Sequence, residues 1–136
     1  MDRPVDGPDH FPVVATMRVH GADDLVRARR LVATTAAGLG LGADRIEQFT
    51  IAVNEVATNA LVHGSGNGTI TVTSSETAIT VEVRDHGAGL GATPGPDMPH
   101  PTDIGGRGLW LARQFCDHLE ISSSTSGTTV LLAMRL

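Results

Sequence analysis

The sequence feature that most restricts the possible folds is a long amphipathic segment from Ala43 to Val62. Its apolar residues recur every three or four positions, which is the spacing of one face of an α-helix. These residues are Ile46, Phe49, Val53, Val56, Ala57, Ala60 and Leu61. A helix of this length with one apolar stripe must bury the stripe against another layer of structure. The rest of the chain therefore has to supply that layer.

Apolar and β-branched segments on both sides of this helix can form the second layer. Strands are expected at 11–19, 69–74, 79–85, 119–124 and 128–136, and further helices at 22–39 and 109–116. Short polar links between neighbouring strands predict two hairpins. Strands paired in hairpins and helices grouped together predict a two-layer α+β sandwich.

The segment 86–106 differs in composition from the rest of the chain, because it contains four prolines and many glycines. It cannot form regular structure, and a loop of this length within a compact domain is usually functional. Residues 1–10 are polar and are expected to form a flexible tail. With 136 residues in total, the remainder, 11–136, is expected to be one domain.

Composition excludes several classes of function. All ten basic residues are arginine, which excludes a P-loop and a Schiff-base lysine. A net charge of −5 without a long basic run argues against direct nucleic-acid binding. The single cysteine, Cys116, excludes an internal disulfide and a cysteine-based zinc site. No apolar stretch is long enough to span a membrane, and we expect a cytoplasmic protein.

Four short groups of residues, or patches, contain side chains or backbone groups that could bind a ligand or catalyse a reaction, and the first two lie on the helix and at the end of a strand. Glu55 and Asn59 lie four residues apart, so they share one face of the helix, with a carboxylate suited to act as a base and an amide oxygen suited to Mg²⁺. Asp85 ends an apolar strand and is followed by Gly87 and Gly89, which allow a ligand ring to approach the backbone. Either patch taken alone is also compatible with ordinary surface structure.

The other two patches lie later in the chain. Gly105, Gly106, Arg107, Gly108 and Leu109 open a helix, and the backbone N–H groups of such a turn can bind an anion. Gly127, Thr128, Thr129 and Val130 open the last strand, where a hydroxyl can join the polar network of Asp85. The spacing does not match the dinucleotide-binding fingerprint, because prolines interrupt the glycines.

In this order, the four patches resemble the motifs of the Bergerat-type ATP-binding fold, over residues 12 to 136. Within that superfamily, NEVATNALVHG and GGRGLWLARQFCD look most like the bacterial anti-sigma-factor serine/threonine kinases. The resemblance implies a mixed, mainly antiparallel sheet with helices on one face. It also implies ATP and Mg²⁺ as cofactors.

The resemblance implies a role for each site residue. Glu55 would activate the attacking hydroxyl, and Asn59 would bind Mg²⁺. Asp85 would accept a hydrogen bond from the adenine amine, with Thr129 supporting it through water. Gly87 and Gly89 would accommodate the adenine and ribose, residues 91–104 would form the ATP lid, and residues 105–109 would wrap the phosphates, with Arg107 adding charge.

The same resemblance implies a homodimer that sequesters a sigma factor and phosphorylates an anti-sigma-factor antagonist. Arg27, Arg29 and Arg30 on the first helix are a candidate partner surface. Two other functions fit the sequence. One is an ATP-binding regulatory module that sequesters a partner without phosphorylating it. The other is a detached histidine-kinase catalytic domain, which would transfer phosphate to a histidine.

Overall fold

A computed structural model describes residues 13–62, 66–85, 106–125 and 127–136, and there the strands and helices follow the expected order. The strands are β1 (Val13–Val19), β2 (Gly68–Ser74), β3 (Ala78–Asp85), β4 (His118–Ser124) and β5 (Gly127–Arg135). The helices are α1 (Ala22–Gly38), α2 (Ala43–Val62) and α3 (Gly106–Phe115). Helix α3 begins three residues before the expected start at 109. The expected tail at 1–10 and the expected lid at 91–104 lie outside the described residues.

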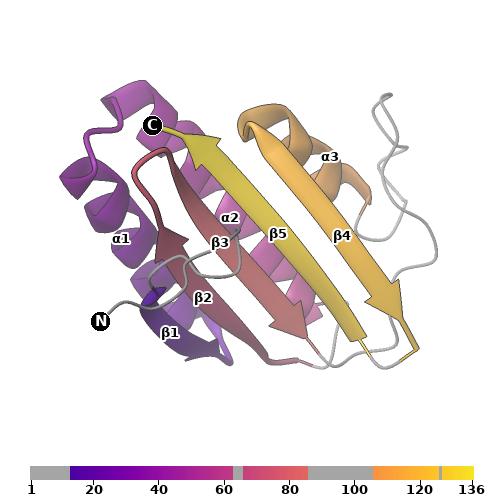
Figure 1. Ribbon diagram of the computed structural model, residues 1–136. Helices are drawn as coiled ribbons and strands as arrows, with labels where there is room; N and C mark the ends of the chain where they lie inside the picture. The colour runs from indigo at the N-terminus through magenta and orange to yellow at the C-terminus, as the bar shows by residue number, and fades with distance from the viewer. Residues whose placement is uncertain (1–12, 63–65, 86–105, 126) are drawn as a thin grey trace, which may run out of the picture.

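The strands form a five-stranded sheet in the order β1-β2-β3-β5-β4, and the helices lie together against one face of it (Figure 1). Every pairing between described strands is antiparallel. The α+β sandwich with helices on one face is therefore confirmed, while the described strands contain no parallel pair that would make the sheet mixed. No helix among the described residues is long and apolar enough to cross a membrane.

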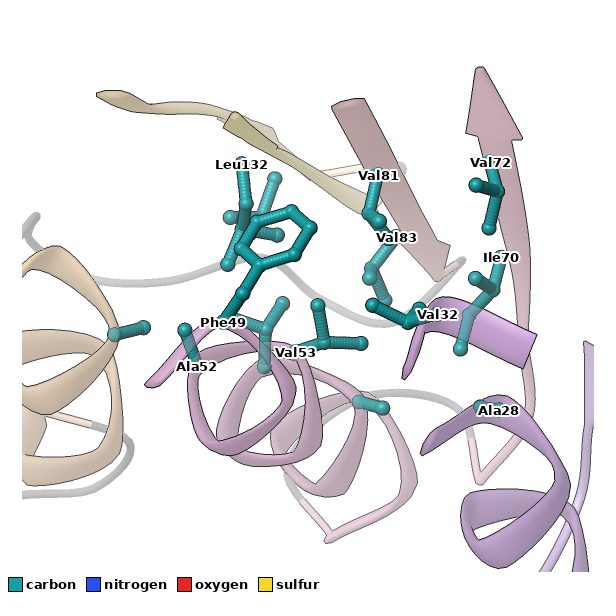
Figure 2. Packing of buried hydrophobic residues seen from close by; sticks show 14 of the residues in the cluster. Ala28, Val32, Phe49, Ala52, Val53, Ile70, Val72, Val81, Val83 and Leu132 are labelled. Atoms are coloured by element: carbon teal, nitrogen blue, oxygen red, sulfur yellow. The ribbon is translucent and has the colours of Figure 1, made fainter. Parts of the chain in front are cut away.

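The core lies between the sheet and the helices, with α2 at its centre (Figure 2). Phe49 and Val53 on α2 are fully buried, and they point toward side chains of the central strands such as Val81 and Leu132. Burial alternates along β3 and β5, as expected for a sheet with one covered face. Each fully buried aliphatic or aromatic side chain stabilises the fold by about 1.5–3 kcal/mol, so this stripe fixes how α2 is rotated.

A cluster of charged side chains joins the start of α2 to the start of β4 and the end of β5. The Oδ2 of Asp117 accepts a hydrogen bond from Nη2 of Arg45 at 2.6 Å and from the backbone N–H of Arg135 at 2.8 Å. Arg45 Nη2 also donates to the carbonyl oxygen of Arg135 at 3.0 Å. The backbone N–H of Arg135 is the main cause that lowers the pKa of Asp117 below its ordinary value of 3.8, and Arg45 lowers it further.

This cluster predicts a specific loss of stability in acid. Because the pKa of Asp117 is lower in the folded chain, its carboxylate stabilises the fold above the unfolded-state pKa, and that contribution is lost as the pH falls through the folded pKa. Asp117→Asn should therefore lower the free energy of unfolding at pH 7. It should also reduce the amount by which the free energy of unfolding falls between pH 5 and about pH 2. Urea unfolding across this range measures both effects.

The matched control is Glu76→Gln, because Glu76 is exposed in the link between β2 and β3. This variant should follow the wild-type pH dependence. An acid loss in Asp117→Asn as steep as that of wild type would contradict the role given to Asp117.

Candidate functional site

The polar face of α2 carries Glu55 and Asn59, and both side chains are half-buried. The start of α3 lies directly against them. A Cβ added at Gly108 would lie 2.8 Å from the Oε1 of Glu55 and 3.7 Å from the Oδ1 and Nδ2 of Asn59. Since real Cβ atoms essentially never approach a heavy atom this closely, the absence of a side chain at Gly108 allows this contact.

Helix α3 begins at this contact, and the backbone N–H groups of a helix's first turn have no partner within the helix. The turn contains Gly106, Arg107 and Gly108. Free N–H groups and the helix dipole make such an end suitable for a phosphate or another anion. Leu109 is 2% exposed and its side chain belongs to the core, so only its backbone can take part in the predicted anion site.

Asp85 lies at the same end of the fold. In the sheet it is directly opposite Gly68 on β2 and Thr128 on β5. A Cβ added at Gly68 would lie 3.5 Å from the Cβ of Ala60, which follows Asn59 on α2. The second half of α2, the start of β2 and the end of β3 therefore meet, and Asp85 lies at the end of the sheet where Glu55 and Asn59 are found.

The structure disagrees with the expectation for Thr129. Thr129 is directly opposite Arg84, and its Oγ1 accepts a hydrogen bond from Arg84 Nε at 3.4 Å. Directly opposite residues of an antiparallel pair point to the same face, so Thr129 lies on the open face of the sheet. Asp85 points to the helix-covered face, where its neighbour on β5 is Thr128. Thr128 is only 6% exposed, and it takes the position beside Asp85 that we expected for Thr129.

The structure also gives Arg29 a contact that the sequence analysis missed. Its Nη1 donates a hydrogen bond to the Oδ1 of Asn54 at 2.7 Å, which links α1 to α2. Asn54 precedes Glu55, and its side chain faces α1. Arg29 was expected to belong to an arginine surface, and the structure instead ties it to α2. Only a pairing between helices could have shown this, because the spacing of arginines within one helix contains no such information.

The described residues do not support a cysteine or a multi-carboxylate metal site. Burial raises the pKa of the Cys116 thiol to about 11, and its Sγ donates to the carbonyl oxygen of Ala112 at 3.1 Å. A thiol with this pKa is a poor nucleophile near neutral pH. Within the described ranges, no group of three or more histidine, cysteine, aspartate or glutamate side chains could hold a metal.

A hollow on the other face of the sheet is separate from this site. It is lined by residues of all five strands, including Thr71, Thr80, Glu82, Leu131 and Ala133. These residues point away from the helices, so the hollow does not communicate with Glu55, Asn59 or Asp85.

The expectations for Gly87, Gly89 and Gly105 concern residues outside the described ranges. The roles expected for Glu55, Asn59, Asp85 and Arg107 stay predictions. The geometry brings Glu55, Asn59 and Gly108 together and places Asp85 at the same end of the sheet. A carboxylate, an amide oxygen and a helix N-terminus in one place can activate a hydroxyl and bind a phosphate.

Comparison with known proteins gives concordant matches. A family model described as histidine kinase-like ATPase domain matches residues 21–134. An anti-sigma F factor of Thermoanaerobacter sp. (strain X514) is 34% identical over 116 residues, which cover 79% of this chain and 80% of that protein. The anti-sigma F factor of Bacillus licheniformis is 31% identical over 120 residues, covering 80% of this chain and 82% of that one.

A solved structure shows the same fold. The RsbU and RsbW domains of Rv1364c from Mycobacterium tuberculosis align with a TM-score of 0.66 and 17% identity. The alignment covers 90% of this chain and 33% of that longer chain.

The contact between Gly108 and Glu55 predicts an energetic coupling between the two positions. Gly108→Ala should change the free energy of unfolding by less than about 1 kcal/mol, because the Glu55 carboxylate has to move away from the new methyl group and this offsets the gain of alanine over glycine in a helix. In a Glu55→Ala background the same change should be neutral or stabilising, because alanine is a better helix former than glycine. Urea unfolding of the single and double variants measures the coupling.

Gly38→Ala is the control, since Gly38 is also in a helix and a Cβ there meets nothing within 4 Å. It should not be destabilising in either background. Equal effects of Gly108→Ala with and without Glu55 would contradict the contact.

Proposed function

The chain belongs to the histidine kinase-like ATPase domain family, and we propose that it is an anti-sigma factor that binds ATP and phosphorylates a serine or threonine of an antagonist protein. The observation that carries the proposal is the placement of Glu55 and Asn59 against the first turn of α3. The relatives named anti-sigma F factor support it, because they match about four fifths of this chain and of their own length. In the proposal, residues 11–136 act as one ATP-binding domain.

The nucleotide would lie between Asp85 and α3. Asp85 would accept a hydrogen bond from the exocyclic amine of adenine, and Thr128, its neighbour in the sheet, would bind the base or a water beside it. The phosphates would lie at the first turn of α3, where N–H groups are free of partners within the helix. This places the terminal phosphate beside Glu55 and Asn59.

The residues at this position fit Mg²⁺. The ion usually retains several waters and binds one or two protein oxygens together with substrate phosphates. Asn59 offers such an oxygen from its side-chain amide, 3.7 Å from the position of a Cβ on Gly108. Bound Mg²⁺ would neutralise phosphate charge during transfer.

Glu55 would act as the general base. Its carboxylate would accept the proton of the attacking serine or threonine hydroxyl, while the N–H groups of α3 hold the phosphate in place. In phosphoryl transfer, most catalysis comes from such positioning and electrostatic stabilisation. Gly108 contributes by letting the phosphate-binding turn approach the base closely.

The partner surface would be the exposed side of α1. Arg27 is 67% exposed and lies 3.4 Å from Asp24, and Arg30 is also exposed, whereas Arg29 is occupied with Asn54. We therefore assign Arg27 and Arg30, rather than all three arginines, to the surface that meets the sigma factor or the antagonist. The proposal includes a homodimer in the cytoplasm.

A second candidate is an anti-sigma factor that binds ATP and sequesters its partner without phosphorylating it. The names of the matched relatives state the anti-sigma role alone. A detached histidine-kinase catalytic domain would instead give an acid-labile phosphohistidine. Incubation with labelled ATP and a candidate antagonist separates the three functions by whether phosphate is transferred and to which residue type.

Glu55→Ala should separate nucleotide binding from phosphate transfer. Loss of a general base is expected to slow transfer to the antagonist by about 10²–10⁴-fold. ATP affinity should change by less than about threefold, because Asp85 and the first turn of α3 are intact. Calorimetry measures the affinity, and single-turnover transfer from labelled ATP measures the rate.

The matched control is Glu47→Ala, which removes an exposed glutamate from the same helix two turns away. It should leave both quantities unchanged. Undiminished transfer by Glu55→Ala would refute the role of Glu55 as base, and loss of ATP binding would make it a binding residue instead.

A further inference from the structure

Polar side chains form a row across the end of the sheet, on the face that the helices cover. Gly68, Asp85, Thr128 and Ser123 are paired in succession across β2, β3, β5 and β4. Directly opposite residues point to the same face of an antiparallel sheet, so the side chains of Asp85, Thr128 and Ser123 point to the face that carries the core. At this end of the sheet Thr128 is buried, Asp85 is half-buried and Ser123 is exposed.

The neighbouring row toward the core is entirely apolar. It consists of Ile70, Val83, Val130 and Ile121, paired in the same succession. On this face of the sheet, the side chains therefore change from apolar to polar between one row and the next, which is two residues along each strand. Buried polar side chains are almost always hydrogen-bonded, so the buried member of this row is expected to belong to a network of hydrogen bonds.

The middle member of the row is buried and hydrogen-bonded. Thr128 is 6% exposed, and its Oγ1 lies 3.2 Å from the Oγ of Ser123. Either hydroxyl can donate this hydrogen bond, because both can rotate about their C–O bonds. An ionised carboxylate, in contrast, only accepts. The one fixed acceptor of the row is therefore Asp85, at the end opposite Ser123.

We propose that Ser123 is a positioning residue for nucleobase recognition, which it serves by donating a hydrogen bond to Thr128. Thr128 then directs its own hydrogen toward Asp85 or a water shared with it. In a chain of hydrogen bonds that all donate in the direction of a carboxylate, each hydrogen bond polarises and strengthens the next. The inference rests on the proposed function, in which Asp85 binds the base of ATP.

This direction of the hydrogen bonds favours a purine with an exocyclic amine. The Asp85 carboxylate accepts a hydrogen bond from the amine of adenine. The Thr128 hydroxyl already donates its hydrogen to Asp85 or to the shared water, so it is not available to the base. Inosine triphosphate, ITP, carries a carbonyl oxygen in place of that amine, and the row then offers it no donor. Without Ser123, the Thr128 hydroxyl can rotate and donate to that carbonyl, so ITP binds better relative to ATP.

The test measures ATP and ITP affinities by calorimetry for wild type, Ser123→Ala, Ser123→Thr and Ser122→Ala. A net hydrogen bond of about 0.5–1.5 kcal/mol corresponds to about two- to tenfold in affinity. Ser123→Ala should lower the ATP affinity and the ATP-to-ITP affinity ratio within that range. Ser123→Thr retains a hydroxyl and should restore both.

Ser122→Ala is the matched control, because Ser122 is the preceding serine and lies opposite Thr129 on the open face. It should behave as wild type. Thermal unfolding without nucleotide shows whether each variant is folded.

An ATP-to-ITP affinity ratio that Ser123→Ala leaves unchanged would overturn the role of Ser123, even if both affinities fall equally. A purely structural role does not alter base selectivity. A wild-type chain that binds neither nucleotide would overturn the proposed function itself, and the role of Ser123 would fall with it.

Discussion

The packing of α2 against the centre of the sheet is the interaction on which the rest of the structure depends. Phe49 and Val53 are fully buried toward the strands, so α2 cannot rotate without exposing apolar surface. Successive residues of a helix point about 100° apart. The orientation that buries these two side chains therefore also fixes where Glu55 and Asn59 point. The same helix that organises the core holds the candidate catalytic pair. A loss of α2 packing would therefore also displace Glu55 and Asn59.

The candidate site is assembled from the ends of elements that are far apart in the sequence. Antiparallel pairing brings the end of β3 beside the start of β5, so Asp85 and Thr128 become neighbours although 43 positions separate them. The glycine at Gly108 allows the start of α3 to reach Glu55. The proposed acceptor for the base, the first turn of α3 and the Glu55 carboxylate thus lie at the same end of the fold.

Sequence patterns predicted the elements well because periodicity reports burial directly. The stripe on α2 and the alternation along β3 each follow from one segment alone, so neither required knowledge of its neighbours. These patterns could not show which residues of two different segments lie opposite each other. Thr129 was assigned to Asp85, whereas the register of β3 against β5 places Thr128 opposite Asp85. In the same way, Arg29 looked like a surface charge until the approach of two helices paired it with Asn54.

The most direct measurement of the central claim is calorimetry of ATP and ADP, with and without Mg²⁺, on wild type and Asp85→Asn. Asparagine keeps the size of the side chain but removes the charge and one acceptor, so it tests recognition of the base rather than the fold. Wild-type protein should bind ATP, Mg²⁺ should strengthen this binding, and Asp85→Asn should abolish it. Absence of ATP binding by the wild-type chain, or undiminished binding by the variant, would contradict the claim.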